Sequence, residues 1–377
     1  MIECEIAVIG GGIAGYAAAC FLAEAKGSGS EIALIERESQ PGYHTTGRSA
    51  AMYTEVYGNA TIRAMVRAAR PFLENPERRF ADRSFLAPRG ALMVANETQA
   101  ARIDAFLEEM NRPDLLEKVG RDRCLDISPA LDPERVVGGV YEAAAMDIDV
   151  HALLQAYVRV FRGLEGRSLH DAEVRGISGQ AGAFEIETAV GTVKAGLIVN
   201  ASGAWGDMIG QMAGAAPVGL VPMRRTAITF DPPAGMDPSK WPLTFDIDEE
   251  WYFKPDAGRI LASPADETPA GPSDAQPEEL DIAICIDRIE TATTLQVRRP
   301  ASRWAGLRCF VDDHSPVNGF DDKVEGFYWL IGQGGYGIKT SSTMARIAAA
   351  RITAQPIPDD ILAQGLDPAN LAVERLR

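Results

Sequence analysis

The feature that most constrains this chain is a glycine-rich turn close to its N-terminus. The apolar run Ile6–Ile9 leads directly into Gly10-Gly11-Gly12-Ile13-Ala14-Gly15, and alanine-rich sequence follows. A buried strand, a tight turn and a helix in this order are typical of a dinucleotide-binding unit. Gly10 allows the turn, Gly12 lets the backbone approach a pyrophosphate, and Gly15 lets the helix pack close to the strand. The first turn of the helix then offers N–H groups to the anion.

A second strand strengthens this prediction. Residues 31–36 are mostly apolar and end in Glu36, which stands 21 residues after Gly15. A carboxylate that binds the ribose of a dinucleotide is expected about 20 residues after the glycine turn. Because the residue is an acid, a ribose with free hydroxyls is favoured over one that carries a 2′-phosphate.

Composition limits the other partners. With 377 residues, two domains are expected, and the net charge of −16 argues against nucleic acid or an anionic membrane surface. No apolar run reaches the length of a membrane span and no signal peptide precedes the first strand, so a cytoplasmic location is predicted. The five cysteines and four histidines show neither disulfide nor metal-ligand spacing, and no metal is expected.

The residues after Glu36 carry a family resemblance. A turn-rich loop over 37–52, which includes the run GYHTTGRSAA at 42–51, is expected to lead into a helix. Together with the glycine turn, it resembles flavoproteins of the D-amino-acid oxidase and glycine/sarcosine oxidase superfamily, and within it most of all the bacterial D-arginine dehydrogenases. The resemblance continues through FLAPRGALMVA (85–95), LIVNASGAWGDMI (197–209), PMRRTAITF (222–230), WYFKPDAG (251–258), RRPASRWAGLRCF (298–310) and GQGGYGIKTS (332–341).

The resemblance implies an α/β plus α+β fold, in which a Rossmann-type domain binds FAD and a mixed β-sheet domain binds substrate. Glycine turns occur from residue 10 to residue 337, so the FAD domain must be discontinuous. We place it at 1–84, 142–214 and 324–377, and the substrate domain at 85–141 and 215–323. The FAD is expected to be non-covalent, because Cys309, near the position where some sarcosine oxidases bond FAD, is predicted to be a buried free thiol. The FAD-binding residues implied are Gly10, Gly12, Ile13, Ala14, Gly15, Glu36, Arg37, Thr46, Gly47, Arg48, Ser49, Ala50, Ala51, Val174, Ala201, Gly203, Trp205, Gly334, Gly335, Tyr336, Gly337, Ile338, Lys339 and Thr340.

The spacing of apolar residues, together with the positions of glycine and proline, predicts the remaining helices and strands. Helices are expected at 59–76, 97–111, 149–163, about 278–293 and 341–350. Strands are expected at 90–95, 136–141, 184–188, 196–200, 217–230 and 326–331, and a surface loop at 264–277.

Two arginines are candidates for binding a substrate carboxylate. Arg225 and Arg308 each lie in an apolar strand, where an unpaired guanidinium is costly to bury. From the residues alone they could equally form internal salt bridges, but both match carboxylate-binding arginines of the D-arginine dehydrogenase pattern. Arg224 should point to the opposite face of the same strand.

Other pocket residues also come from the resemblance. Tyr252 matches a tyrosine whose hydroxyl reaches the carboxylate and Tyr57 matches a pocket tyrosine, although either could be a core aromatic. Gly335 matches the glycine beside the substrate amine or carboxylate, and Phe245 and Ile338 would line the side-chain pocket.

Departures from the pattern bear on the substrate. Met52 replaces a histidine near the amine, and Ala91 replaces the glutamate that pairs with the substrate guanidinium. Lys339 stands where that enzyme has glutamine and resembles the carboxylate-binding lysine of sarcosine-type oxidases, although a solvated lysine is the alternative. These changes disfavour D-arginine and favour neutral, acidic or N-substituted amino acids.

The predicted function is FAD-dependent oxidation of an amino acid, favouring the D-enantiomer, to an imino acid and then a 2-oxo acid. Hydride transfer from Cα to flavin N5 requires no side-chain base of the Ser-His-Asp kind. Alternatives are oxidation of secondary amines such as N-methyl amino acids or opines, a 2-hydroxy-acid dehydrogenase, and a non-catalytic flavin-binding subunit. Oxygen and quinone both stay open as electron acceptors, and so does the oligomeric state.

Overall fold

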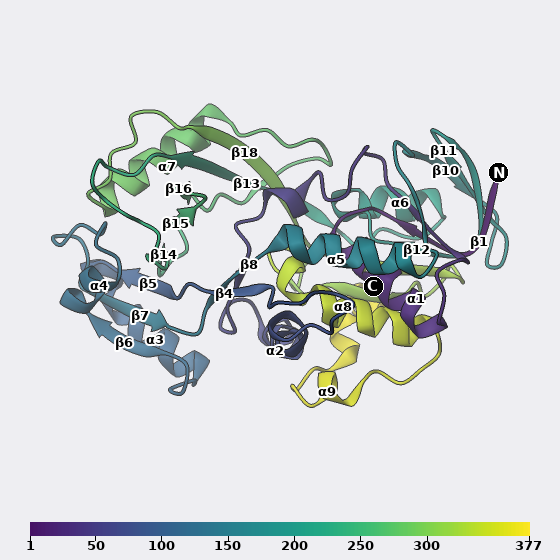
Figure 1. Ribbon diagram of the computed structural model, residues 1–377, viewed down its shortest axis with the longest axis horizontal. Coiled ribbons are helices and arrows are strands. Elements are labelled where there is room, and N and C mark those ends of the chain that lie inside the picture. The colour runs from purple at the N-terminus through teal and green to yellow at the C-terminus, as the bar shows by residue number, and fades with distance from the viewer.

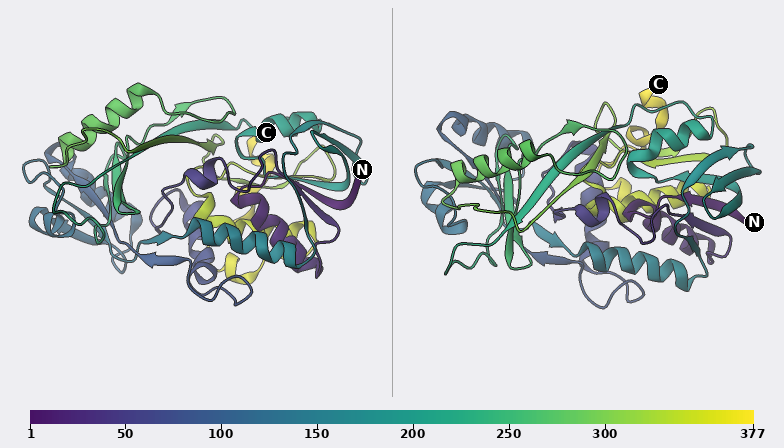
Figure 2. Two further views of the ribbon diagram at one scale, coloured as in Figure 1. Left: turned by 45° about the horizontal axis from the view of Figure 1, so that its top comes forward. Right: turned by 90° about the horizontal axis from the view of Figure 1, so that it is seen from above.

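The computed structural model describes residues 1–377, which form two regions joined side by side (Figure 1). One region is built on an eight-stranded sheet and the other on a nine-stranded sheet. We call them the eight-stranded and the nine-stranded region. Both ends of the chain lie in the eight-stranded region, as the turned views also show (Figure 2). None of the helices combines the length and hydropathy that crossing a membrane requires.

The eight-stranded sheet has a parallel centre. β1 (Ile2–Ile9) lies between β2 (Ile32–Ile35) and β12 (Gly191–Asn200), and β12 also pairs in parallel with β20 (Phe327–Ile331). The central strands are apolar and buried over Ile6–Ile9, Ile32–Ile35 and Phe327–Ile331, as expected for strands covered on both faces. The edges are formed by β9 (Arg167–Leu169), β10 (Val174–Ser178) and β19 (Val317–Phe320), and β11 (Phe184–Thr188) lies between β10 and β12.

Helices pack together over this sheet. α1 (Ile13–Lys26) packs against α5 (Val150–Gly163) and α8 (Gly337–Ile352), and α8 packs in turn against α2 (Ala60–Glu74). The alanines at positions 17–19 of α1 are fully buried and permit this close approach. At Gly15 a Cβ atom would lie 1.8 Å from the carbonyl oxygen of Gly10, so only glycine fits there.

The nine-stranded sheet is mostly antiparallel. β13 (Val221–Phe230) pairs with β16 (Arg259–Ser263), β17 (Thr268–Pro269) and β18 (Ser302–Phe310). The sheet continues through β15 (Tyr252–Asp256), β14 (Leu243–Asp246), β5 (Ala91–Ala95), β7 (Gly138–Glu142) and β6 (Glu117–Gly120). α3 (Ala100–Met110), α4 (Arg121–Ile127) and α7 (Glu279–Ala292) pack on it.

Short elements complete the fold. A three-stranded sheet of β3 (Met52–Tyr53), β8 (Met146–Ile148) and β4 (Leu86–Pro88) lies where the chain passes between the regions. The others are α6 (Gly206–Met212), α9 (Asp359–Leu362) and the 3-10 turns Thr45–Arg48, Glu97–Gln99, Gly203–Trp205, Pro368–Leu371 and Val373–Leu376.

Most predicted elements are present, with four differences. The helix expected after the loop over 37–52 is wrong: the segment forms only the 3-10 turn Thr45–Arg48, and Met52 then pairs with Asp147 in β3–β8. α8 begins at Gly337 instead of residue 341, and β12 begins at Gly191 instead of residue 196 because its first half pairs with β11. β19 belongs to the eight-stranded sheet although it precedes the domain boundary predicted at 324.

Candidate active site

Two adjoining cavities connect the glycine turn with the nine-stranded sheet. Their volumes are about 250 Å³ and 660 Å³. They are contiguous, since both are lined by Gly12, Thr46, Arg48 and Gly203. We call them the small and the large cavity.

The small cavity lies at the start of α1. Gly10 has a φ of +110°, and a Cβ there would lie 2.4 Å from the carbonyl oxygen of Ala201. The Ile13 N–H donates to Thr46 Oγ1 at 3.0 Å, whereas the N–H groups of Gly12, Ala14 and Gly15 have no acceptor within the protein. Free N–H groups at the positive end of a helix suit a phosphate. The turn therefore fits the pyrophosphate of a dinucleotide.

Glu36 closes the same cavity from the end of β2. Its carboxylate is buried and accepts from the backbone N–H of Gly11 at 2.5 Å and of Glu38 at 2.8 Å. Arg37, Val174 and Trp205 line the cavity beside it. Glu36 therefore lines the same cavity as the glycine turn, and its binding of a ribose stays a prediction.

The large cavity begins at the N-terminus of α8. The N–H groups of Gly337, Ile338 and Lys339 have no acceptor within the protein. Gly334 precedes them with a φ of +52°, and a Cβ at Gly335 would lie 2.0 Å from Arg308 Nη2. The N-terminus of α8 is therefore a second helix end that suits negative charge. The loop just before it lies directly against the Arg308 side chain.

The segment 45–51 connects both cavities to the nine-stranded sheet. Thr45 Oγ1 donates to the carbonyl oxygen of Leu307 at 2.8 Å, and Arg48 donates to those of Ala275 and Ala305 at 3.0 and 2.9 Å. Arg48 also pairs with Asp274. Ser49, Ala50 and Ala51 follow along the wall of the large cavity.

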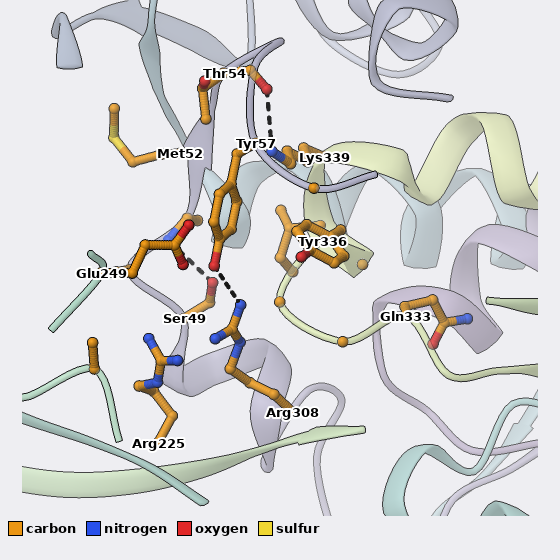
Figure 3. Close-up of a pocket in the computed structure, with 18 of the residues that line it drawn as sticks. Ser49, Met52, Thr54, Tyr57, Arg225, Glu249, Arg308, Gln333, Tyr336 and Lys339 are labelled. Carbon is orange, nitrogen blue, oxygen red and sulfur yellow. Dashed lines mark hydrogen bonds between the residues drawn. The ribbon is translucent and has the colours of Figure 1, made fainter. Parts of the chain in front are cut away.

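Arg225 and Arg308 lie side by side in the large cavity (Figure 3). In the antiparallel pair β13–β18, Arg308 lies opposite Met223 and Arg225 opposite Gly306, so the two arginines share one face. Arg308 Nη2 donates to the hydroxyl of Tyr57 at 2.9 Å. Arg224 points away and pairs with Glu278 and Asp281 near α7, which confirms the predicted alternation.

Both arginines also pair with Glu267. Its Oε1 atom lies 2.9 Å from Arg225 Nη2 and 2.8 Å from Arg308 Nη1. Both arginines thus form an internal ion pair and also line the cavity, and their binding of a substrate carboxylate stays a prediction.

Lys339 lies in a buried aromatic setting beside the arginines. Its Nζ lies 5.1 Å from the ring centroid of Tyr57 and 5.5 Å from that of Tyr336, and it donates to the carbonyl oxygen of Thr54 at 3.1 Å. Burial lowers its pKa to about 7, although the nearby Glu142 carboxylate opposes this shift. Lys339 therefore faces the cavity rather than solvent, and its charge changes near neutral pH.

The rest of the large cavity is mainly apolar. Met52, Ala91, Phe245, Tyr252 and Ile338 all line it. Further apolar residues come from the nine-stranded region, namely Met93, Phe106, Met110, Ile247 and Trp251. The part of the large cavity that these apolar residues line can accommodate an uncharged side chain of a ligand.

A few predicted cofactor residues lie outside both cavities and support the turns instead. A Cβ at Gly47 would lie 2.7 Å from the carbonyl oxygen of Gly42, and Thr340 Oγ1 donates to the carbonyl oxygen of Tyr336 at 3.0 Å. Gly15 packs against Gly10, as described above. Cys309 lines the large cavity, and burial raises the pKa of its thiol to about 12. Such a thiol is a poor nucleophile.

Six charged or titratable residues that line the large cavity were missed by the sequence analysis: three lie on helices α2 and α3, namely Arg63, Arg102 and Glu109, and three lie on turns or loops. Glu249 comes from the β14–β15 turn, Glu267 from the loop before β17, and His314 from the turn after β18, where it stacks on Phe310 at 4.7 Å. Glu249 and His314 have positive φ values of 58° and 56°. No motif marks these positions, and their directions depend on turns that only the fold defines.

Comparisons with known proteins agree with this architecture. A family model described as FAD dependent oxidoreductase (DAO) matches residues 5–351. Mitochondrial dimethylglycine dehydrogenase of Homo sapiens is 23% identical over 270 residues, which cover 69% of this chain and 30% of that protein. The chain thus spans less than a third of that relative's length. L-2-hydroxyglutarate dehydrogenase of Escherichia coli is 25% identical over 223 residues, covering 56% of this chain and 50% of that protein.

Solved structures share the fold over nearly the whole chain. Glycine oxidase from Geobacillus kaustophilus has a TM-score of 0.81 at 20% identity, with 99% of each chain covered. Iminodiacetate oxidase from Chelativorans sp. BNC1 has a TM-score of 0.80 at 18% identity, with 98% of each covered. L-alpha-glycerophosphate oxidase from Mycoplasma pneumoniae, solved with FAD bound, has a TM-score of 0.82 at 16% identity, covering 94% of this chain and 95% of that one. The finer resemblance to D-arginine dehydrogenases stays a prediction.

Proposed function

Because the chain belongs to the FAD dependent oxidoreductase family (DAO), we propose that it oxidises an amino acid or an N-substituted amino acid at Cα, with the D-enantiomer preferred. FAD, when bound, accepts the hydride that leaves Cα. The resulting imino acid is hydrolysed by water to a 2-oxo acid. The observation that carries the proposal is the pair of arginines in a cavity that adjoins the glycine turn.

We assign the eight-stranded region to FAD binding. The free N–H groups after Gly12 would hold the pyrophosphate, and Glu36 would hold the ribose. The residues of the small cavity beside Glu36 would contact the adenine side. Segment 45–51 and the N-terminus of α8 would hold the flavin side, where the helix end stabilises negative charge.

Arg225 and Arg308 are assigned to the substrate carboxylate. A guanidinium presents five N–H donors in a planar fork that matches a carboxylate. Arg308 uses part of its fork for Tyr57 and Glu267, and Gly335 leaves it the space to lie flat against the loop before α8. This arrangement fixes the carboxylate beside the predicted flavin site.

The amine must be unprotonated before Cα gives up a hydride. Burial raises the pKa of Tyr57, so its phenol stays protonated at neutral pH and acts as a hydrogen-bonding group rather than as a base. Lys339 already donates to Thr54, so we assign it a role as a nearby positive charge for the carboxylate. The ammonium proton would then leave to water, without a dedicated base.

The direct test is anaerobic reduction of the purified flavoprotein. D- and L-amino acids, N-methyl amino acids and 2-hydroxy acids are each mixed with the protein, and the loss of flavin absorbance is followed. Reduction by amino acids, with D- faster than L-, is the expected result. Reduction by hydroxy acids alone, or by none of the panel, would refute the proposal.

Secondary amines are a second candidate. The segment Gly335–Lys339 resembles the carboxylate-binding sequence of sarcosine-type oxidases, and its lysine faces the cavity. If N-methyl amino acids reduce the flavin faster than the corresponding primary amino acids, this candidate replaces the first.

A further inference from the structure

Glu267 places a carboxylate of the protein itself in the arginine pair. One oxygen, Oε1, accepts from both Arg225 and Arg308 at 2.9 and 2.8 Å. No other carboxylate of the chain forms an ion pair with either arginine. A ligand carboxylate that binds these arginines must therefore share them with Glu267.

The backbone on both sides of Glu267 is anchored. Asp266 accepts from the Thr226 N–H at 2.6 Å and from the Thr226 hydroxyl at 3.1 Å, and its carbonyl oxygen accepts from Arg225 Nε at 2.8 Å. On the other side, β17 pairs with β13, and the Ala270 N–H donates to the carbonyl oxygen of Pro222 at 2.9 Å. The Glu267 side chain thus extends over the arginines from a fixed backbone.

Charges around the arginines are nearly balanced. Arg225 and Arg308 are positive, and Lys339 is positive only in part near neutral pH because burial lowers its pKa to about 7. Glu267 and Glu249 are negative, and Glu249 lines the cavity without an ion-pair partner (Figure 3). With one ligand carboxylate the net charge of this group is zero when Lys339 is protonated and −1 when Lys339 is neutral. A second ligand carboxylate would meet the carboxylates of Glu267 and Glu249 beside the arginine pair. Of the other arginines that line the cavity, Arg48 pairs with Asp274, Arg102 pairs with Asp248, and Arg63 donates to the carbonyl oxygen of Gly58.

We propose that Glu267 is a specificity-determining residue that restricts this site to substrates with a single carboxylate. Amino monocarboxylates are accepted, and dicarboxylates, including acidic amino acids and opine-like compounds, are disfavoured. The inference rests on the proposed function in that Arg225 and Arg308 bind the substrate carboxylate. It narrows the substrate range, since the sequence had left acidic substrates open.

The test compares two unreactive ligands of equal chain length, valerate and glutarate, which differ by one carboxylate. Dissociation constants are measured by calorimetry on the FAD-bound protein. Glu267→Gln preserves the shape of the side chain and removes its charge. It should tighten glutarate binding about tenfold or more and valerate binding by a clearly smaller factor. One carboxylate of each ligand shares the arginines with Glu267, but only glutarate brings a second like charge.

Glu278→Gln is the matched control. Glu278 pairs with Arg224 on the opposite face of β13, so its loss should leave both ligands unchanged. Glu267→Asp, which withdraws the carboxylate by one methylene, should shift glutarate in the same direction by a smaller factor. An unchanged ratio of the two dissociation constants in Glu267→Gln, or equal weakening of both ligands, would overturn the proposal.

The outcome separates this inference from the proposed function. Neither ligand can be oxidised at a Cα–N bond, so the binding result does not depend on turnover. If no amino acid reduces the flavin but Glu267→Gln tightens glutarate binding, the proposed function is wrong and the assignment of Glu267 stands. If the protein oxidises amino acids but Glu267→Gln leaves the ratio of the two dissociation constants unchanged, only the assignment of Glu267 is wrong.

Discussion

Replacement of Arg308 by methionine tests the arginine pair most directly. Methionine keeps much of the length of the side chain but has no donor. In the structure Arg308 is 9% exposed and donates to Tyr57 and to Glu267 at 2.9 and 2.8 Å. A substrate carboxylate would lose up to two charge-assisted hydrogen bonds, each worth about 1.5–3 kcal/mol. Loss of about 3 kcal/mol or more corresponds to at least about a 100-fold weaker dissociation constant.

The assay is rapid-mixing reduction of the flavin over a range of substrate concentrations. It separates the dissociation constant from the limiting rate, and both should worsen because the carboxylate also orients Cα. The matched control is Arg224→Met, which removes the neighbouring arginine on the opposite face of β13. Arg308→Lys keeps the positive charge but lacks the planar fork of donors, so its dissociation constant should lie between those of the unaltered protein and Arg308→Met.

The result that would refute this reasoning is specific. If Arg308→Met retains FAD and binds substrate within about threefold of the unaltered protein, Arg308 does not hold the carboxylate. If Arg224→Met weakens binding as strongly, the effect arises from general disturbance of the sheet. Removing one partner of a buried ion pair can destabilise a protein. In Arg308→Met, however, Glu267 is 45% exposed and keeps Arg225 as a partner, and the thermal midpoint of the variant shows whether it remains folded.

Four further predictions follow from distances and charges in the site. Gly335→Ala should weaken substrate binding while FAD is retained, because its Cβ would lie 2.0 Å from Arg308 Nη2. Titration with substrate measures the affinity, and the flavin absorbance of the purified variant measures the FAD content. Gly10→Ala should abolish FAD binding, since its Cβ would lie 2.4 Å from a carbonyl oxygen, whereas Gly27→Ala, at a positive φ but in open space, should cost only about 1 kcal/mol of stability with FAD content unchanged. Carboxylate affinity should rise as the pH falls through about 7, where Lys339 gains its proton, and Lys339→Met should remove this dependence. Because the folded-state pKa of Lys339 is lowered, its contribution to stability should increase from pH 7 upward, which denaturant titration of the same variant checks.

Local sequence signals were sufficient for much of the fold and part of the site. The turn at Gly10 and the carboxylate at Glu36 are predictable because their function depends on neighbours in sequence and on a fixed spacing. The opposite directions of Arg224 and Arg225 follow from the period of a strand. That both cavity arginines share one face needed the register of β13 and β18, which no single segment contains.

The other site residues depend on long-range packing. Glu267 reaches Arg308 only because Asp266 binds Thr226 in another strand. The helix expected near residue 50 fails because Ala51 has a φ of +26° and Met52 pairs with a strand from beyond residue 140. Glycines before α8 suggested a loop, yet the helix already starts at Gly337, and its first turn lines the cavity.

The order of strands in the eight-stranded sheet has a consequence for how the protein is made. β12 gains its second parallel neighbour only from β20, and α1 gains a main packing partner only from α8. A nascent chain that ends before residue 327 therefore exposes an apolar edge of β12, and exposed strand edges promote aggregation. Contacts between such distant segments also slow folding. Cofactor uptake should thus follow synthesis of almost the entire chain, and FAD supply during expression should change the yield of native protein more than the speed of early collapse.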